Sequence, residues 1–349
     1  MLSNRGSLLL PTLAILLQGP IFVSSITRSC HSNVEIRRFI AEVSYDGSDF
    51  AGWQLQSNKR SVQGTLNDVL TSIYNYPVTV CGASRTDKGV HSRGQIIHFD
   101  LPSSYIDEDT VKSIDNLNNI LPNDIKFSRW SHAPIGMLPI QGPDGLPFHA
   151  IENAISKHYS YEFTASENII NPMTTRYRAS LYNYKAVQTL DLEAFQNALN
   201  IFIGEHDFRA FGNRLDVRAK KSEEHSQRTF SAVRTIHSAS ITEYRTPHLL
   251  RKYCPDAFFS PNQTSTRTST AYSDDVFYRV DIVLDGALYK MLRNIIAGCV
   301  EVGYGTMSLQ ELRTLLYGGA DRAGNRLVTA PACGLYLQSV RYNENVFHD

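Results

Sequence analysis

The sequence lacks several features that would restrict its function. Its five cysteines include no C-x-x-C pair, which excludes a zinc ribbon, a thioredoxin motif and a dense disulfide framework. No charge is in excess, since 34 Lys and Arg residues stand against 34 Asp and Glu residues. With 42% hydrophobic and 10% aromatic residues, the chain is neither disordered nor a coiled coil. This composition is typical of a folded, soluble protein with one large domain or two ordinary ones, suited to a reducing compartment.

The amino-terminal residues 1–34 contain no acidic residue and differ in composition from the rest of the chain. Their apolar run over 8–23 is interrupted by Pro11, Gly19 and Pro20, whereas a membrane span needs about 20 apolar residues. We therefore expect a targeting or disordered leader and no stable membrane insertion of the mature protein. The lack of acidic residues favours an organelle, mitochondrion or plastid. A secretory signal is the alternative, and without a functional leader the protein would be cytoplasmic.

The remaining residues, 35–349, carry 32 basic against 34 acidic side chains, so any nucleic-acid surface must be a local patch. One set of basic residues is dense enough to form such a patch: Arg176, Arg178, Lys185, Arg209, Arg214, Arg218, Lys220, Lys221, Arg228 and Arg234. Acidic residues are interleaved with them, which leaves a solvated loop as an equal alternative.

The pattern of apolar residues predicts an α+β fold. Residues 39–130 give the order strand, helix, strand, strand, helix, strand, which is the split βαβ pattern of ferredoxin-like domains. A related pattern returns after residue 157, and its clearest helix runs over 288–300. We expect two ferredoxin-like lobes, 35–145 and 146–349, that form a continuous, mostly antiparallel sheet with helices on the outer faces. The polar stretch at about 246–275 is expected to be a flexible insertion in the second lobe.

The segment 81–95 holds the densest cluster of polar and glycine residues. It connects a short expected strand over 78–81 to another over 95–100, with an expected turn at Lys88-Gly89. Arg85 and Asp87 lie two positions apart, so in an extended backbone both side chains project to the same side. The guanidinium then favours the ionised carboxylate, which can act as a nucleophile or as a general base. The alternative is an ion pair that only ties the loop together.

This segment resembles a known family. The stretch 84–91, with Gly94-Gln95 and His98-Phe99, is similar to the R-T-D-x-G-V-H…G-Q…H-F signature of TruA-type tRNA pseudouridine synthases. Seven other blocks occur in the order of that family: 45–56 with 61–63, 118–125, 148–150, 159–161, 204–211, 291–298 and 334–337. A single R-T-D would be weak evidence, but matching blocks from about residue 36 to 342 are specific.

The resemblance implies a pseudouridine synthase fold and an isomerase that converts uridine to pseudouridine in the anticodon stem-loop of tRNA, at positions 38–40. Asp87 would be the catalytic aspartate and would attack either the base or the sugar. Arg85 would fill the space left by the flipped-out nucleotide, and Tyr159 would stack on the uracil and take a proton late in the reaction. Arg293 would pair with Asp87. The family implies a homodimer, no cofactor and no metal.

Two other functions remain open from the sequence. The first is a catalytically inactive RNA-binding or tRNA chaperone module of the same fold. The second is a metal-independent hydrolase that uses the same aspartate.

Other polar residues have structural interpretations. His91, His98, His149 and His206 lie on separate elements without the spacing of a metal motif, so we interpret them as structural histidines. Tyr159 and Tyr161 are expected on opposite faces of one strand, so that only one of them reaches the site.

Five residues depart from the family pattern. Ile151 stands where arginine is usual, and Lys157-His158 occupies a position where two basic residues, often arginine, precede the tyrosine. Lys88 replaces the usual small residue after the aspartate, and Ser84 replaces the common glycine. None of these changes removes a candidate catalytic group, so activity is expected.

Overall fold

The computed structural model describes residues 36–103, 114–133, 148–165, 174–181, 189–213, 215, 231–245, 276–319, 321–343 and 346–347. The strands in this part of the chain are β1 (Ile36–Tyr45), β2 (Cys81–Gly82), β3 (His91–Pro102), β4 (Ile125–His132), β5 (Ser156–Thr164), β6 (Ala179–Ser180), β7 (Gly204–Asp207), β8 (Val233–Arg245), β9 (Val276–Leu284) and β10 (Leu335–Arg341). The α-helices are α1 (Val62–Tyr74), α2 (Ile114–Ile120), α3 (Leu192–Asn200), α6 (Met291–Gly303) and α7 (Leu309–Tyr317). Among the described helices, none has the length and apolar character needed to cross a membrane.

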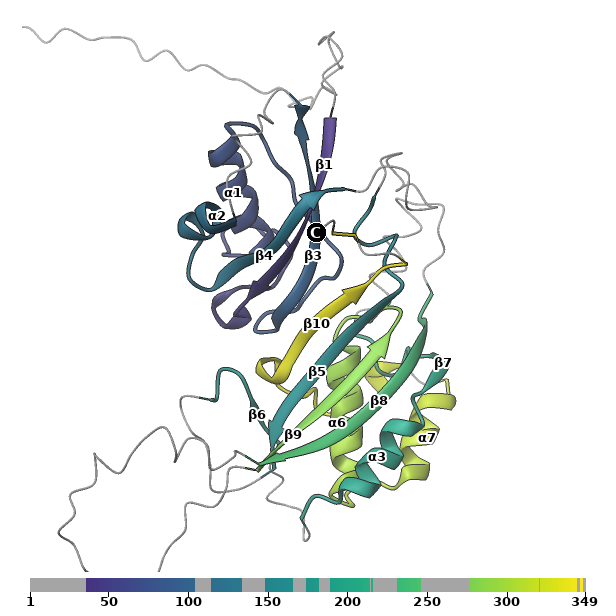
Figure 1. Ribbon diagram of the computed structural model, residues 1–349. Helices are drawn as coiled ribbons and strands as arrows, with labels where there is room; N and C mark the ends of the chain where they lie inside the picture. The colour runs from purple at the N-terminus through teal and green to yellow at the C-terminus, as the bar shows by residue number, and fades with distance from the viewer. Residues whose placement is uncertain are drawn as a thin grey trace, which may run out of the picture.

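One large sheet organises the molecule, and its main path runs β4-β1-β3-β10-β5-β9-β8-β7 (Figure 1). β2 pairs with β3, and β6 pairs with β5. Neighbouring strands are antiparallel except in the β3–β10 and β5–β6 pairs, which are parallel. The last strand, β10, lies between β3 and β5 and joins the earlier strands to the later ones. The expected α+β fold with a mostly antiparallel sheet is confirmed.

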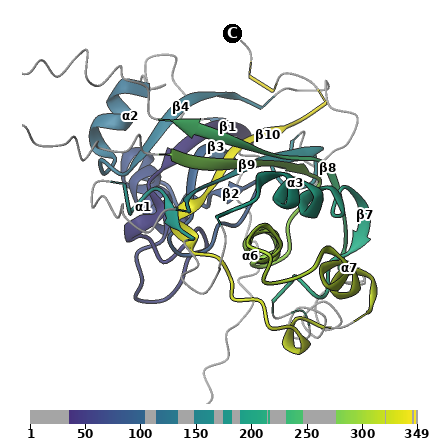
Figure 2. The same ribbon diagram turned by 90° about the horizontal axis from the view of Figure 1, so that it is seen from below.

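The helices pack on the sheet through apolar stripes that recur every three or four residues. In α1, Leu66 and Leu70 are buried, and the Ser61 side chain caps the first turn by accepting a hydrogen bond from the Gly64 N–H. In α6, Leu292 and Ile296 belong to the largest core cluster. Figure 2 shows α1, α3, α6 and α7 on the same side of the sheet. The candidate site described below lies on this side.

The apolar residues form three clusters. The largest joins β5 and β9 to α3 and α6, and the second joins β1 and β3 to α1. The third covers the opposite face of β1 and β3, where Ile40 and Ile96 contact a group that includes Phe148 and Phe347. The division into lobes at residue 145 stays a prediction, and the expected leader and the 246–275 insertion lie outside the described residues.

Some elements differ from the sequence-based expectation, among them the strand before β3 and helix α7. A strand was expected over 78–81, but only Cys81–Gly82 pairs with β3. The reason is that the Val78 and Val80 N–H groups donate to the Thr71 and Asn67 side chains of α1 instead of to a strand. Helix α7 was not expected, although its capping box between Ser308 and Glu311 is a signal that the sequence contains.

Arg38 on β1 ties three elements together. Its guanidinium donates to both carboxylate oxygens of Asp100 at 2.7 and 2.8 Å and to the Phe148 carbonyl at 2.5 Å. The Arg38 side chain is only 2% exposed. This bond holds the segment beginning at Phe148 against the sheet.

We expect Arg38→Ala to lower the free energy of unfolding by about 3 kcal/mol, because a buried charge partner and a carbonyl contact are lost together. Arg60→Ala is the matched control, since Arg60 binds Asp124 in the same two-bonded geometry but is 39% exposed. The control is expected to cost about 1 kcal/mol or less. Denaturant unfolding measures both values, and equal losses would contradict the assignment of Arg38.

Candidate active site

The segment that carries Asp87 forms a tight turn between β2 and β3. The Asp87 carbonyl accepts a hydrogen bond from the Val90 N–H at 3.1 Å, and Gly89 adopts a positive φ of 79°. The turn expected at Lys88-Gly89 is therefore present. It presents the Asp87 carboxylate as a partly buried group, with a side chain 21% exposed.

The turn contacts the end of β1 and the segment that follows it. The Thr86 carbonyl accepts a hydrogen bond from the Trp53 N–H at 3.0 Å, and the Thr86 hydroxyl bonds to the buried Tyr45 hydroxyl at 2.8 Å. Gly52 has a φ of 108°, and a Cβ there would lie 2.9 Å from the Thr86 oxygen. Glycine is required because the two backbones approach too closely for a side chain.

Arg293 approaches Asp87 from the first turn of α6. Its Nη1 lies 3.4 Å from the Asp87 Oδ2, and its Nε donates to the Ala330 carbonyl at 2.6 Å. The Arg293 side chain is 12% exposed and that of Asp87 is 21% exposed, so the pair is partly shielded from water. The positive charge favours the ionised form of the carboxylate.

Tyr159 extends from β5 toward the same turn. Its hydroxyl lies 2.6 Å from the Ser84 hydroxyl, and the residue is 4% exposed. Burial, reinforced by the negative charge of Asp87 and partly offset by the bond to Ser84, raises the pKa of Tyr159 to about 12. The phenol is therefore neutral at pH 7.

The expectation that Tyr159 and Tyr161 point to opposite faces was wrong. Residues two positions apart on a strand share a face, and both rings belong to the largest core cluster. Their positions along β5 separate them, because the Tyr161 hydroxyl donates to the Pro331 carbonyl at 2.9 Å and the Tyr159 hydroxyl reaches Ser84.

The structure thus brings together Asp87, Tyr159 and Arg293 from the β2–β3 turn, β5 and α6. Arg85 lies on the same turn with an exposed side chain, as does Lys88. In the sequence, Arg85 is the arginine nearest to Asp87. In the structure, Arg293 pairs with the Asp87 carboxylate. An aromatic ring, an ionised carboxylate and an exposed guanidinium are the groups needed to hold and react with an unstacked base.

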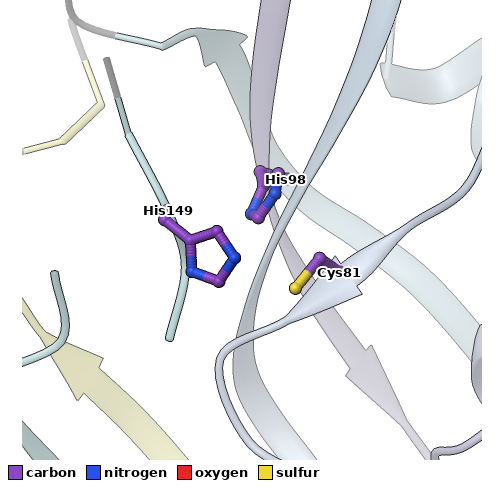
Figure 3. A group of neighbouring side chains, drawn as sticks. All are labelled: Cys81, His98 and His149. Carbon is purple, nitrogen blue, oxygen red and sulfur yellow. The ribbon is translucent and has the colours of Figure 1, made fainter. Parts of the chain in front are cut away.

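A second polar group lies on the other side of β3, where Cys81, His98 and His149 place one potential ligand atom each within 4.8 Å of one another (Figure 3). Sequence spacing did not predict this group, which forms because Cys81 and His98 are register partners in the β2–β3 pair. Each ring uses its Nδ1 to accept a backbone N–H, from Ala150 for His98 and from Glu152 for His149. A metal-bound histidine normally donates a proton from its second ring nitrogen, whereas the Nδ1 of each of these rings accepts one. We interpret the group as structural.

Two of the other histidines are also held by the backbone. His91 accepts the Gly47 N–H at its Nδ1 and donates from Nε2 to the Arg176 carbonyl, and burial lowers its pKa. His206 contacts the Ile203 carbonyl through Nε2 at 3.1 Å. These contacts agree with the structural interpretation of both residues.

Comparison with known proteins supplies the deciding observation. The family profile described as tRNA pseudouridine synthase matches residues 41–135 and 198–343. The chain belongs to this family. It is 31% identical to the tRNA pseudouridine synthase A of Leuconostoc citreum, with 88% of this chain and 98% of that protein covered. The enzymes of the same name from Latilactobacillus sakei and Anoxybacillus flavithermus are 31% and 30% identical, each covering 88% of this chain.

The positions that depart from the family pattern have distinct environments. Lys157 is buried, which lowers the pKa of its ammonium group, and His158 contacts Asp281 at 2.7 Å. Ile151 is 40% exposed, so an arginine there would reach solvent. Ser84 contacts Tyr159 directly, as described above.

The basic patch is only partly within the described residues. Arg176 contacts Asp49 at 2.5 Å, Arg178 lies over the Phe277 ring, and Arg209 contacts Asp207 at 2.7 Å. Of these three, Arg176 and Arg209 are about half exposed despite their acidic partners. Arg214, Arg218, Lys220, Lys221, Arg228 and Lys185 lie outside the described residues.

The close approach at Gly52 gives a test of how the turn is held. We expect Gly52→Ala to lower the free energy of unfolding by about 1–3 kcal/mol, because it imposes an unfavourable φ and pushes on the Thr86 carbonyl. Gly324→Ala is the control, since a Cβ there would meet nothing within 4 Å. Thermal unfolding followed by circular dichroism compares the two variants. A loss of the same size at Gly324 would contradict this interpretation.

Proposed function

We propose that this protein isomerises uridine to pseudouridine in tRNA. The observation that carries the proposal is the ion pair between Asp87 and Arg293 beside the buried Tyr159 ring, in a chain that belongs to the tRNA pseudouridine synthase family. The relatives compared above are named for the same activity.

Asp87 is proposed as the group that attacks the target nucleotide. Attack on the base or on the sugar allows the glycosidic bond to break, after which the uracil turns and a carbon–carbon bond forms. Arg293 keeps the carboxylate ionised and fixes its direction, since the Ala330 carbonyl holds the same guanidinium from behind.

Arg85 and Tyr159 are proposed to handle the base. A uridine within a stem must leave its stack before Asp87 can reach it, and the exposed Arg85 side chain is placed to fill the vacated space. The Tyr159 ring stacks on the uracil, an interaction worth about 1–3 kcal/mol per base. Lys88 is available at the surface for a neighbouring phosphate.

Three finer points extend the proposal. The resemblance supports the anticodon stem-loop, at positions 38–40, as the target, and a homodimer as the working form. The acid-free residues 1–34 support an organelle as the location. Liquid chromatography of digested tRNA, sedimentation of the purified protein and imaging of a tagged full chain test these points in turn.

The experiment that tests the function incubates the full chain with unmodified tRNA transcripts and maps the modified sites. Pseudouridine in the anticodon arm is the expected result. Binding of tRNA without turnover would support the inactive RNA chaperone, and release of free uracil would support a hydrolase. Either outcome would overturn the proposal.

Asp87→Asn retains the shape of the side chain and removes its negative charge. We expect the single-turnover rate to fall by at least about 1000-fold, with tRNA affinity changed by about threefold or less. Asp68→Asn on the exposed surface of α1 is the control and should leave the rate unchanged. A variant at position 87 that keeps substantial turnover would exclude the carboxylate as the reacting group.

Arg293→Ala separates catalysis from binding. We expect the rate to fall by about 100-fold or more, because Asp87 loses its charge partner, while tRNA affinity changes by about threefold or less. Single-turnover kinetics and filter binding measure the two quantities. Equal losses in rate and affinity would show that Arg293 contacts RNA instead of orienting Asp87.

A further inference from the structure

A bond between two hydroxyl groups links the turn that carries Asp87 to strand β5. The Ser84 Oγ and the Tyr159 Oη lie 2.6 Å apart, within the range of a good O–H···O hydrogen bond. A glycine at this position would have no side chain to form such a bond. The link is therefore particular to chains that carry a hydroxyl at this position.

Ser84 is itself held rigidly. The Gln95 side chain accepts the Ser84 N–H at 3.1 Å and donates to the Ser84 carbonyl at 2.6 Å. Gln95 is fully buried on β3, so its amide has little freedom to move. Because the backbone N–H and carbonyl of Ser84 are both hydrogen-bonded to Gln95, the Ser84 hydroxyl is held in position next to Tyr159.

Tyr159 depends on this contact. Its hydroxyl is buried, and within the described part of the chain Ser84 is the one group that hydrogen-bonds to it. Asp87 is the ionisable group whose charge acts on it, and that negative charge disfavours a phenolate. The tyrosine thus meets substrate as a neutral phenol whose orientation is set by Ser84.

We propose that Ser84 is a positioning residue for Tyr159 and accepts the phenolic proton when Tyr159 takes up the hydrogen displaced from the uracil ring. This inference rests on the proposed function. Pseudouridine formation joins the sugar to C5 of the base, so the hydrogen on C5 must leave as a proton.

The proton transfers balance without a change in net charge. The C5–H bond breaks, its electron pair stays in the ring, and the proton moves to the Tyr159 Oη. The original hydroxyl proton of Tyr159 passes to the Ser84 Oγ, and the serine proton passes to water at its partly exposed side. The N1 atom of the base, freed from the sugar, takes one proton from water. A neutral phenol is a weak base, so it needs an acceptor for its own proton at the same moment.

The experiment compares Ser84→Ala, Ser84→Thr, Tyr159→Phe and the double variant Ser84→Ala/Tyr159→Phe in the full chain with tRNA transcript. We expect Ser84→Ala to slow single turnover by about 10-fold with tRNA affinity within about twofold of the starting protein. Ser84→Thr keeps the hydroxyl and should restore the rate to within about threefold. The double variant should be no slower than Tyr159→Phe alone, because both changes remove the same path. Ser128→Ala, on the exposed surface of β4, is the control.

Three results would overturn the proposal: a Ser84→Ala variant as fast as the starting protein, a threonine variant as slow as alanine, or losses that add in the double variant. A second measurement is independent of turnover. In protein with carbon-13 at the tyrosine Cζ, Ser84→Ala should shift the Tyr159 resonance at neutral pH, and an unchanged resonance would exclude the hydroxyl contact. A starting protein that forms no pseudouridine would refute the proposed function, while the resonance would still test Ser84.

Discussion

The ion pair between Asp87 and Arg293 joins residues 206 positions apart, and the candidate site depends on it. The carboxylate sits on a turn near the start of the chain, and the guanidinium sits on a helix near its end. A hydrogen bond to a backbone group holds each partner in place. The Asp87 carbonyl accepts the Val90 N–H, and the Arg293 Nε donates to the Ala330 carbonyl. Neither half of the chain contains the pair alone, so the fold as a whole defines the chemistry.

Several buried contacts hold the turn that carries Asp87. Buried groups hold two residues of the turn: Tyr45 and Gly52 contact Thr86, and Gln95 bonds to Ser84. Such support restricts the carboxylate to one direction before any RNA arrives, which lowers the entropy lost on reaching a reactive geometry. The surface of the same turn is different in character, since Arg85 and Lys88 remain exposed and able to meet a charged ligand.

Much of the fold could be predicted from the sequence because its signals are local. The apolar stripe of α6 and the serine cap of α1 both correspond to observed helices, and the turn at Lys88-Gly89 follows from the glycine. The strand expected over 78–81 is shorter in the structure, because the backbone N–H groups of its valines donate to side chains of α1 and not to a neighbouring strand. The meeting of Cys81, His98 and His149 and the bond from Ser84 to Tyr159 depend on sheet register and tertiary packing, which no spacing in the sequence expresses. The motif match indicated which side chains gather at the site, and geometry alone shows which atoms meet.

The place of β10 in the middle of the sheet has a consequence for biosynthesis. This strand leaves the ribosome after the other described strands, yet it pairs with β3 on one side and β5 on the other. The facing edges of β3 and β5 therefore stay unpaired with β10 until residues 335–341 have been made, and protection by chaperones matters most during that interval. A premature stop codon shortly before residue 335 would remove a central strand, the one that joins β3 to β5, and not a strand at the edge of the sheet.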